Sequence, residues 1–267
     1  MLYLTLTGRN DWESQLAFTD HSSFFYPSVG LSAVLTEMIK LPEFISYAKI
    51  RGSYTSVASS FDRFLSNPGF EFLEQSHQWS TSSTRPAVNL KPERTKSWEI
   101  GLNTKFWNDL SFDFTFYKSN TYNQTFQISQ SSASGFSTAV VQSGNVQNYG
   151  IEMGIGYRHK FGDVEWNSNF TFTMNRNKIK ELMEGAKDPE TGELIADEER
   201  RVATLGAAGY APVIILRKDG GMGDIYVEKH LATDGNGNIK VDSQTGKVSI
   251  AEYPEPRKVG SYMLNVI

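Results

Sequence analysis

Hydrophobic and polar residues alternate along much of this chain. From 110 to 117 the even positions are Leu110, Phe112, Phe114 and Phe116, and polar residues or tyrosine stand between them. Because successive side chains of a β-strand point to opposite faces, this pattern predicts a strand with one apolar and one polar side. The same alternation recurs over 94–107, 148–160 and 164–176, and more weakly over 2–8, 25–36 and 45–57.

The predicted strands are long. Several run to about 13 residues, whereas a typical soluble strand has about 5–6. At ~3.3 Å per residue and a tilt near 40°, such a strand covers roughly 33 Å along a barrel axis, more than the ~25 Å apolar band of an outer-membrane barrel. Strand length therefore favours a transmembrane β-barrel.

The predicted connections alternate between short and long. Tight turns rich in Asn, Asp and Gly lie at 107–110 and 160–163, and a somewhat longer link spans 37–44. Outer-membrane barrels have short periplasmic turns and long extracellular loops, whereas a sandwich has no reason to place every long connection at one end. The long connections predicted here are 9–24, 58–93, 125–147 and 177–258.

The apolar side of these strands needs a cover other than water. Burying a Leu or Phe side chain is worth about 1.5–3 kcal/mol, so the four at 110–116 would forfeit roughly 6–12 kcal/mol in water. The cover is either hydrocarbon or a second protein layer, because any antiparallel sheet with one wet face alternates in this way. Two fold classes stay open: a partial antiparallel transmembrane β-barrel of about seven to eight long strands, which strand length and loop asymmetry favour, and a soluble β-sandwich.

Composition narrows the possible functions. Among 267 residues, 26 Lys and Arg stand against 30 Asp and Glu, and a net charge of −4 argues against a nucleic-acid binder, which needs a basic surface. Cysteine is absent and the four histidines stand far apart, so neither thiolate chemistry nor a histidine-rich metal site is expected. No apolar run approaches the ~20 residues of a spanning helix. Residues 1–7 resemble the middle of a strand rather than a signal peptide, so we expect a piece of a longer protein.

Several short sequence segments resemble one protein family when they are taken in order. The segments are TGRNDW at 7–12, FFYPSV at 24–29, LPEF at 41–44 leading into AKIRGSY at 48–54, KPERTKSWEIGL at 91–102, FTFYKSNT at 114–121, ASGF at 133–136 and GNVQNYGIE at 144–152. In this order and spacing they resemble the SusC/RagA family of TonB-dependent outer-membrane transporters.

The resemblance implies a nutrient importer of the bacterial outer membrane. Its barrel of about 22 strands, embedded in outer-membrane lipid, would enclose an N-terminal plug. A SusD-like surface lipoprotein and TonB would be its partners, and an oligosaccharide or a peptide its ligand. Residues 1–267 are then a partial β-barrel domain, truncated at both ends, which lacks the plug and the final strands and holds seven strands plus the start of another at 259–267.

The rival function is a soluble β-sandwich that acts as a binding or adhesion module. An enzyme is not expected, because the sequence has no metal constellation, nucleophile elbow or cofactor motif. Neither cofactors nor catalytic residues are therefore predicted.

Two groups of residues are candidates for contact with ligands or partners. Charged residues on the polar side would face the lumen, or else hydrogen-bond to the plug or to one another: Lys49, Arg51, Glu99, Lys105, Glu152 and Arg158. Aromatic residues in the long loops suit sugar faces and partner interfaces, although packing among the loops is the alternative for each: Phe61, Phe64, Trp79 and Tyr210.

One loop segment, at 234–245, faintly resembles a calcium-binding loop. Asp234, Asn236 and Asn238 have the spacing of such a loop, but its twelfth position is Thr245 rather than Glu. A tight turn at Asn236 and Gly237 is the better interpretation.

Overall fold

The computed structural model describes residues 1–17, 19–62, 65–66, 70–87, 90–129, 132–189, 191–195, 199–205 and 211–261. The chain divides into two compact units, residues 1–176 with 183–196 and residues 177–182 with 197–267. Two of the aromatic candidates, Phe64 and Tyr210, lie outside the described residues. Within the described ranges, no helix is both long and apolar enough to span a membrane.

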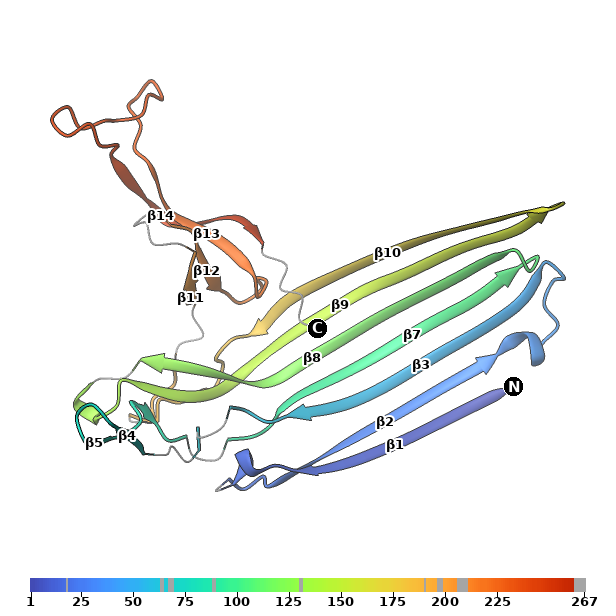
Figure 1. Ribbon diagram of the computed structural model, residues 1–267, viewed down its shortest axis with the longest axis horizontal. Helices are drawn as coiled ribbons and strands as arrows, with labels where there is room; N and C mark the ends of the chain where they lie inside the picture. The colour runs from blue at the N-terminus through green and yellow to red at the C-terminus, as the bar shows by residue number, and fades with distance from the viewer. Residues whose placement is uncertain are drawn as a thin grey trace. The chain divides into compact units, whose positions relative to one another are not determined.

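The first unit is built on an antiparallel sheet whose long strands lie side by side in chain order (Figure 1). These strands are β1 (Leu2–Trp12), β2 (Ser23–Val34), β3 (Ile45–Ser59), β7 (Glu93–Phe106), β8 (Leu110–Ser129), β9 (Thr138–Phe161) and β10 (Val164–Glu181). The short β6 (Thr84–Arg85) pairs in parallel with β9, so the described part of this sheet has eight strands. The predicted fold class, a partial antiparallel barrel, is confirmed.

Short and long connections lie at opposite ends of this sheet (Figure 1). Residues 107–109 join β7 to β8, and both Trp107 and Asn108 have positive φ, at 50° and 64°. Residues 162–163 join β9 to β10, and Gly162 has a φ of 61°. Positive φ is what the tightest hairpin turns need to match the twist of their strands. The helix η2 (Leu35–Glu37) lies in the connection from β2 to β3, at the same end.

Two of the long connections are shorter than predicted, because the strands continue past the alternating segments. β8 and β9 remain paired up to Ser129 and Thr138, so the loop expected over 125–147 is reduced to 130–137. β1 and β2 likewise remain paired up to Trp12 and Ser23. Backbone pairing continues where the two faces no longer differ in polarity, and the hydropathy pattern therefore ends before the strand does.

The apolar face of the large sheet is exposed. The exposed fraction is 67% for Leu6 on β1, 50% for Ile100 on β7 and 57% for Phe170 on β10. On β8 the half-buried rings of Phe112 and Phe114 stack on each other, with centroids 6.4 Å apart. The second layer of a sandwich would enclose these side chains, and no described part of the chain does so. Hydrocarbon is the cover that this geometry leaves.

A small apolar core holds the long connections together. Its buried residues are Leu16 in η1 (Ser14–Leu16), Phe24, Ala58, Phe61, Leu90 and Val140. The short strands β4 (Glu71–Leu73) and β5 (Gln78–Ser80) form a separate hairpin in the connection from β3 to β7. The helix η3 (Ser132–Ser134) lies between β8 and β9.

The second unit shows that the connection predicted over 177–258 contains a sheet of its own. The strands β11 (Arg200–Thr204), β12 (Val213–Leu216), β13 (Asp224–Leu231) and β14 (Ile250–Ser261) form it in this order, around a core of Val213, Ile215 and Tyr226. Residues 259–261 belong to β14 and pair with β13, so the described part of 259–267 does not begin another barrel strand. The run 213–216 is apolar without alternation, as in strands buried on both faces, and gave no period-two signal.

Aspartate side chains hold two tight turns between β13 and β14. Asp234 Oδ1 accepts the backbone N–H groups of Asn236 and Asn238 at 2.9 and 2.8 Å. Asp242 Oδ1 accepts the backbone N–H of Thr245 at 2.7 Å. The turn predicted at 236–237 is confirmed, and the Asp234 carboxylate is one of the groups that form it.

Candidate functional site

The candidate charges lie on the polar face of the large sheet, where strand register aligns them in rows. One row runs from β2 to β9 through Ser32, Arg51, Gly101, Thr115 and Glu152. Because alternate residues of a strand share a face, the adjacent rows on this face lie two positions away along each strand. Residues far apart in the sequence therefore meet at the same level of the wall.

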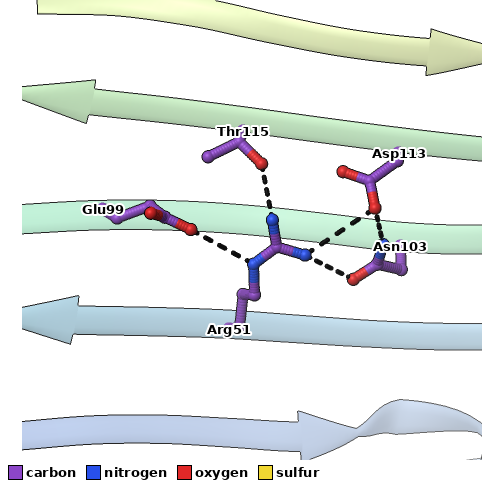
Figure 2. Close-up of polar contacts among 5 residues, drawn as sticks. All are labelled: Arg51, Glu99, Asn103, Asp113 and Thr115. Carbon is purple, nitrogen blue, oxygen red and sulfur yellow. Dashed lines mark hydrogen bonds and ion pairs between the residues drawn. The ribbon is translucent and has the colours of Figure 1, made fainter. Parts of the chain in front are cut away.

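Arg51 of β3 lies among four polar residues of β7 and β8, as Figure 2 shows. Its Nε donates to Glu99 Oε1 at 3.3 Å, its Nη1 to Asn103 Oδ1 at 2.8 Å and its Nη2 to Thr115 Oγ1 at 2.6 Å. Nη1 also lies 3.7 Å from Asp113 Oδ2, and Asn103 donates a hydrogen bond to the same carboxylate. One guanidinium thus joins β3, β7 and β8 and lies between two carboxylates. We call these five residues the Arg51 cluster.

Arg51 reaches β8 because Gly101 has no side chain. A Cβ at position 101 would lie 2.6 Å from Arg51 Nε and 2.8 Å from Cζ, closer than real Cβ contacts allow. A second glycine on this face has the same role, since a Cβ at Gly150 would lie 2.5 Å from the Tyr117 hydroxyl. The positions of these long side chains therefore depend on glycines in the strands that they cross.

The structure brings together only part of the predicted charged set. Arg51 and Glu99 are partners, whereas Arg158 forms an ion pair with Glu165 of β10, beside the turn at 162–163. Within the described residues, no side-chain hydrogen bond or ion pair includes the remaining three candidates, Lys49, Lys105 and Glu152, although the backbone carbonyl of Lys105 accepts a hydrogen bond from Ser46 Oγ at 3.1 Å.

Asn103, Asp113 and Thr115 are members of the Arg51 cluster that sequence analysis did not select. Alternation places them on the polar face, and this was the signal available. Their contact with Arg51 depends on the register between β3, β7 and β8, which alternation does not give. Among the residues that the structure describes, no group of three or more His, Asp or Glu side chains is placed to hold a metal ion.

A row of small hydroxyl side chains crosses the same face, closer to the long connections. Thr7, Ser28, Thr55, Ser97 and Ser119 are successive cross-strand neighbours from β1 to β8. The hydroxyls of Thr55 and Ser97 are hydrogen-bonded at 2.6 Å. Each hydroxyl is both donor and acceptor, so this row offers uncharged hydrogen-bonding groups to whatever lies against the wall.

The two described aromatic candidates differ in exposure. Trp79 on β5 is 68% exposed, and its ring centroid lies 5.2 Å from that of Phe72 on β4. Phe61 is buried in the apolar core of the long connections, as the packing alternative expects. The two exposed rings are tilted by 58° to each other, and exposed aromatic rings of this kind suit contact with a sugar ring or a partner protein.

Fold and polar wall together define a class of protein, the transmembrane β-barrel with one face toward lipid and the other toward an aqueous lumen. A family model described as "TonB dependent receptor-like, beta-barrel" matches residues 1–265. The chain belongs to this family, which places it in the bacterial outer membrane.

Individual relatives agree with this family. The chain is 32% identical over 99 residues to "TonB-dependent receptor P3" of Formosa agariphila, a match that covers 36% of this chain and 10% of that protein. A structure of the RagAB peptide transporter matches with a TM-score of 0.66 and 18% identity, over 95% of this chain and 28% of that one. The RagAB peptide importer in the "open-open" state matches with a TM-score of 0.60 and 17% identity, over 86% and 31%. The chain thus spans less than a third of each relative, and the SusC/RagA-like fold is confirmed.

Proposed function

We propose that this chain forms part of the barrel wall of a TonB-dependent importer, with residues 1–267 as a partial barrel domain. The observation that carries the proposal is the two-sided sheet: an exposed apolar face, and a polar face bearing the Arg51 cluster and the hydroxyl row. Such a sheet separates hydrocarbon from water, which is the task of a barrel wall.

The wall contributes binding surfaces and no bond-making chemistry. In the Arg51 cluster the guanidinium donates its hydrogen bonds to side chains of the neighbouring strands. It therefore stabilises the barrel wall and has few donors left to bind an anionic ligand. Lys49, Lys105 and Glu152 are the candidates for contact with the contents of the lumen. Uptake then depends on differential binding, in which the ligand is held in one conformation of the importer and released in another.

The ligand is an oligomeric nutrient, either a peptide or an oligosaccharide. The fold is shared with RagAB, a peptide importer, and this supports the peptide class. The exposed ring pair of Trp79 and Phe72 supports contact with sugar rings or with a SusD-like surface lipoprotein. TonB supplies the energy from the inner-membrane proton gradient, as the family resemblance implies.

Uptake by intact cells tests this function. Cells that produce the receptor containing this chain are compared with a deletion strain for uptake of a labelled peptide library and a labelled oligosaccharide library. We expect one library to enter only with the receptor, and entry to stop on TonB depletion or on addition of a protonophore. The receptor is expected in the outer-membrane fraction. A receptor found in a soluble fraction, or uptake indifferent to TonB, would contradict the proposal.

A further inference from the structure

A groove opens where β2 and β3 separate. Their pairing ends at Ser28 and Thr55, although β2 stays paired with β1 and β3 with β7 beyond this point. The ladder stops beside Pro27, which has no backbone N–H to donate. The cavity at this separation has a volume of about 510 Å³ and is lined by residues 7–9, 11, 26–28 and 55–58.

Arg9 and Asp11 are the two charged residues that line this groove. Arg9 Nε lies 2.6 Å from Asp11 Oδ1, and the Tyr26 hydroxyl donates to Asp11 Oδ2 at 3.0 Å. The Arg9 guanidinium carbon lies 5.9 Å from the centre of the Tyr26 ring. Each carboxylate oxygen of Asp11 therefore has a partner, and one of the two oxygens contacts the Arg9 guanidinium through Nε.

The outer edge of the Arg9 guanidinium remains open. No described residue contacts Nη1 or Nη2 through a hydrogen bond or ion pair, and the side chain is 76% exposed. These two nitrogens carry four N–H donors in a planar fork, the geometry that matches a carboxylate. Arg51 differs, because all three of its nitrogens are engaged within its cluster.

We propose that this groove is a subsite for a carboxylate group of the imported ligand, bound by Arg9. Arg9 and Asp11 carry one charge of each sign, so the lining is neutral overall, and the carboxylate is recognised by the two open Nη groups of Arg9 rather than by a net positive charge. Ser28 and Thr55 of the hydroxyl row lie in the same groove and bind the polar atoms next to the carboxylate. The inference rests on the proposed import function and names the chemical group that it recognises.

The carboxylate has two possible sources, the C-terminus of a peptide or an acidic sugar, and the experiment distinguishes them. Binding to the purified full-length receptor is measured with two matched pairs of probes. One pair is N-acetylated tetra-alanine with a free C-terminus and the same peptide as its C-terminal amide. The other pair is tetragalacturonate and its methyl ester. We expect the free acid of one pair to bind about ten- to a hundredfold more tightly than its blocked partner.

Three variants assign this preference to Arg9. In Arg9→Gln the free acid and its blocked partner bind equally, because the charged fork is lost. In Asp11→Asn the preference for the free acid increases about two- to tenfold, because a competing carboxylate is removed while the Tyr26 hydroxyl keeps an acceptor. A folding defect cannot produce this gain. The control Arg176→Gln makes the same charge change on β10, outside the groove, and keeps the wild-type preference.

An Arg9→Gln receptor that keeps the wild-type preference for the free acid would overturn the subsite, and so would either of two further results. In the first, the wild-type receptor binds the free and blocked members of both pairs equally, or binds none of the four probes. In the second, Arg176→Gln abolishes the preference as fully as Arg9→Gln does. TonB-dependent uptake is measured separately, so a failed subsite and a failed import function give different results.

Discussion

At the scale of single residues, the arrangement of the polar wall depends on its glycines, which have no side chain. Gly101 lies between Arg51 and Thr115 in the cross-strand row, and the guanidinium passes over it to reach β8. Glycine in a strand interior normally weakens the strand, and it is found where another group must approach the backbone closely. Here the approaching group is an arginine of the same sheet.

Replacing Gly101 with alanine tests this dependence. The new methyl group would overlap Arg51 Nε and Cζ, so we expect a loss of about 1–3 kcal/mol in folding free energy, as for other overpacked sites. The measurement is the urea dependence of refolding of the receptor into lipid vesicles. Gly154→Ala is the matched control, because a Cβ there meets Asp113 Cβ at 3.9 Å, an ordinary contact. Equal stability of the two variants would contradict this account.

The sequence predicted which residues share the polar face, but not which of them touch. Alternation placed Arg51 and Glu99 on one side of their strands, and the structure shows them hydrogen-bonded. The pairing of Arg51 with Asn103 depends on the register between β3 and β7, which are separated by a long connection. The open fork of Arg9 was likewise not visible, because Arg9 appeared only within a family segment and the separation of β2 from β3 cannot be derived from composition.

At the scale of the element, each strand of the large sheet has one face toward hydrocarbon and the other toward water. On β7, Ile100 points to the exposed apolar face, and Glu99 belongs to the Arg51 cluster on the other. If hydrocarbon covers the apolar face, a charge at position 100 must lose its hydration. If water covered it, the same charge would be harmless.

Ile100→Lys therefore distinguishes lipid from water at this face. We expect a cost of about 2–4 kcal/mol in folding free energy in vesicles, as for a lysine near the middle of the bilayer. Ser53→Lys on the neighbouring strand, where the side chain is exposed on the polar face, is expected to cost less than about 1 kcal/mol. A cost at position 100 as small as that at position 53 would argue against hydrocarbon as the cover.

In the second unit, an ion pair links the ends of two strands. Asp224 on β13 accepts hydrogen bonds from Gly221 N–H at 3.0 Å and Ser261 Oγ at 2.8 Å, and its Oδ2 lies 2.6 Å from Lys258 Nζ. Burial alone would raise the pKa of Asp224, but the bonds to Lys258, Gly221 and Ser261 outweigh it and hold this pKa below its usual value. The carboxylate is therefore more acidic in the folded unit than in the unfolded chain.

This lowered pKa predicts a pH dependence for the second unit. The stabilisation is present above the unfolded pKa of about 3.9 and is lost as the pH falls through the lower pKa of the folded state. Amide hydrogen exchange of β13 and β14 in the full-length receptor, measured from pH 6 downward, would follow it. We expect the protection factors, which are exchange rates corrected for the intrinsic pH dependence of amide exchange, to fall in acid for the wild-type protein, and Asp224→Asn to show weaker protection already at pH 6 with less further change. An unchanged acid response in Asp224→Asn would assign the effect to other groups.

At the scale of the whole molecule, the large sheet has two open edges. Among the described residues, β1 and β10 each have a paired neighbour on one side only in the strand order. An open edge presents unpaired N–H and C=O groups, which lipid cannot satisfy. The sheet as described therefore requires further strands to close it.

Residues 1–267 produced alone are expected to remain insoluble in water because of these edges and the exposed apolar face. In detergent, amide exchange is expected to be faster along β1 and β10 than along β7 and β8, each of which pairs on both sides. Sedimentation and exchange mass spectrometry make the two measurements. A monomer that unfolds cooperatively in detergent-free buffer would instead support the soluble sandwich.

The overall architecture was largely predictable, because each strand of the large sheet repeats the same two-residue pattern and the short turns carry Asn, Asp or Gly. The sheet inside the long connection was not. Its buried strand β12 is a continuous apolar run of four residues, and periodicity does not distinguish such a run from other buried segments. The described part of 259–267 shows a related difficulty. Its sequence predicts a strand, but it does not indicate whether that strand belongs to the barrel or, as the structure shows, to the inserted sheet.

The two-sided strands also limit how genes for such walls can change. Deleting one codon in the middle of β7 would move every residue on one side of the deletion to the opposite face of the sheet. Polar residues such as Glu99 would then face hydrocarbon, or apolar residues such as Ile100 would face water. Deletions of two codons would preserve the faces but displace the partners of Arg51. Gains and losses of sequence should therefore accumulate in the connections, where β4, β5 and the whole second unit lie, while the strands keep a constant number of residues.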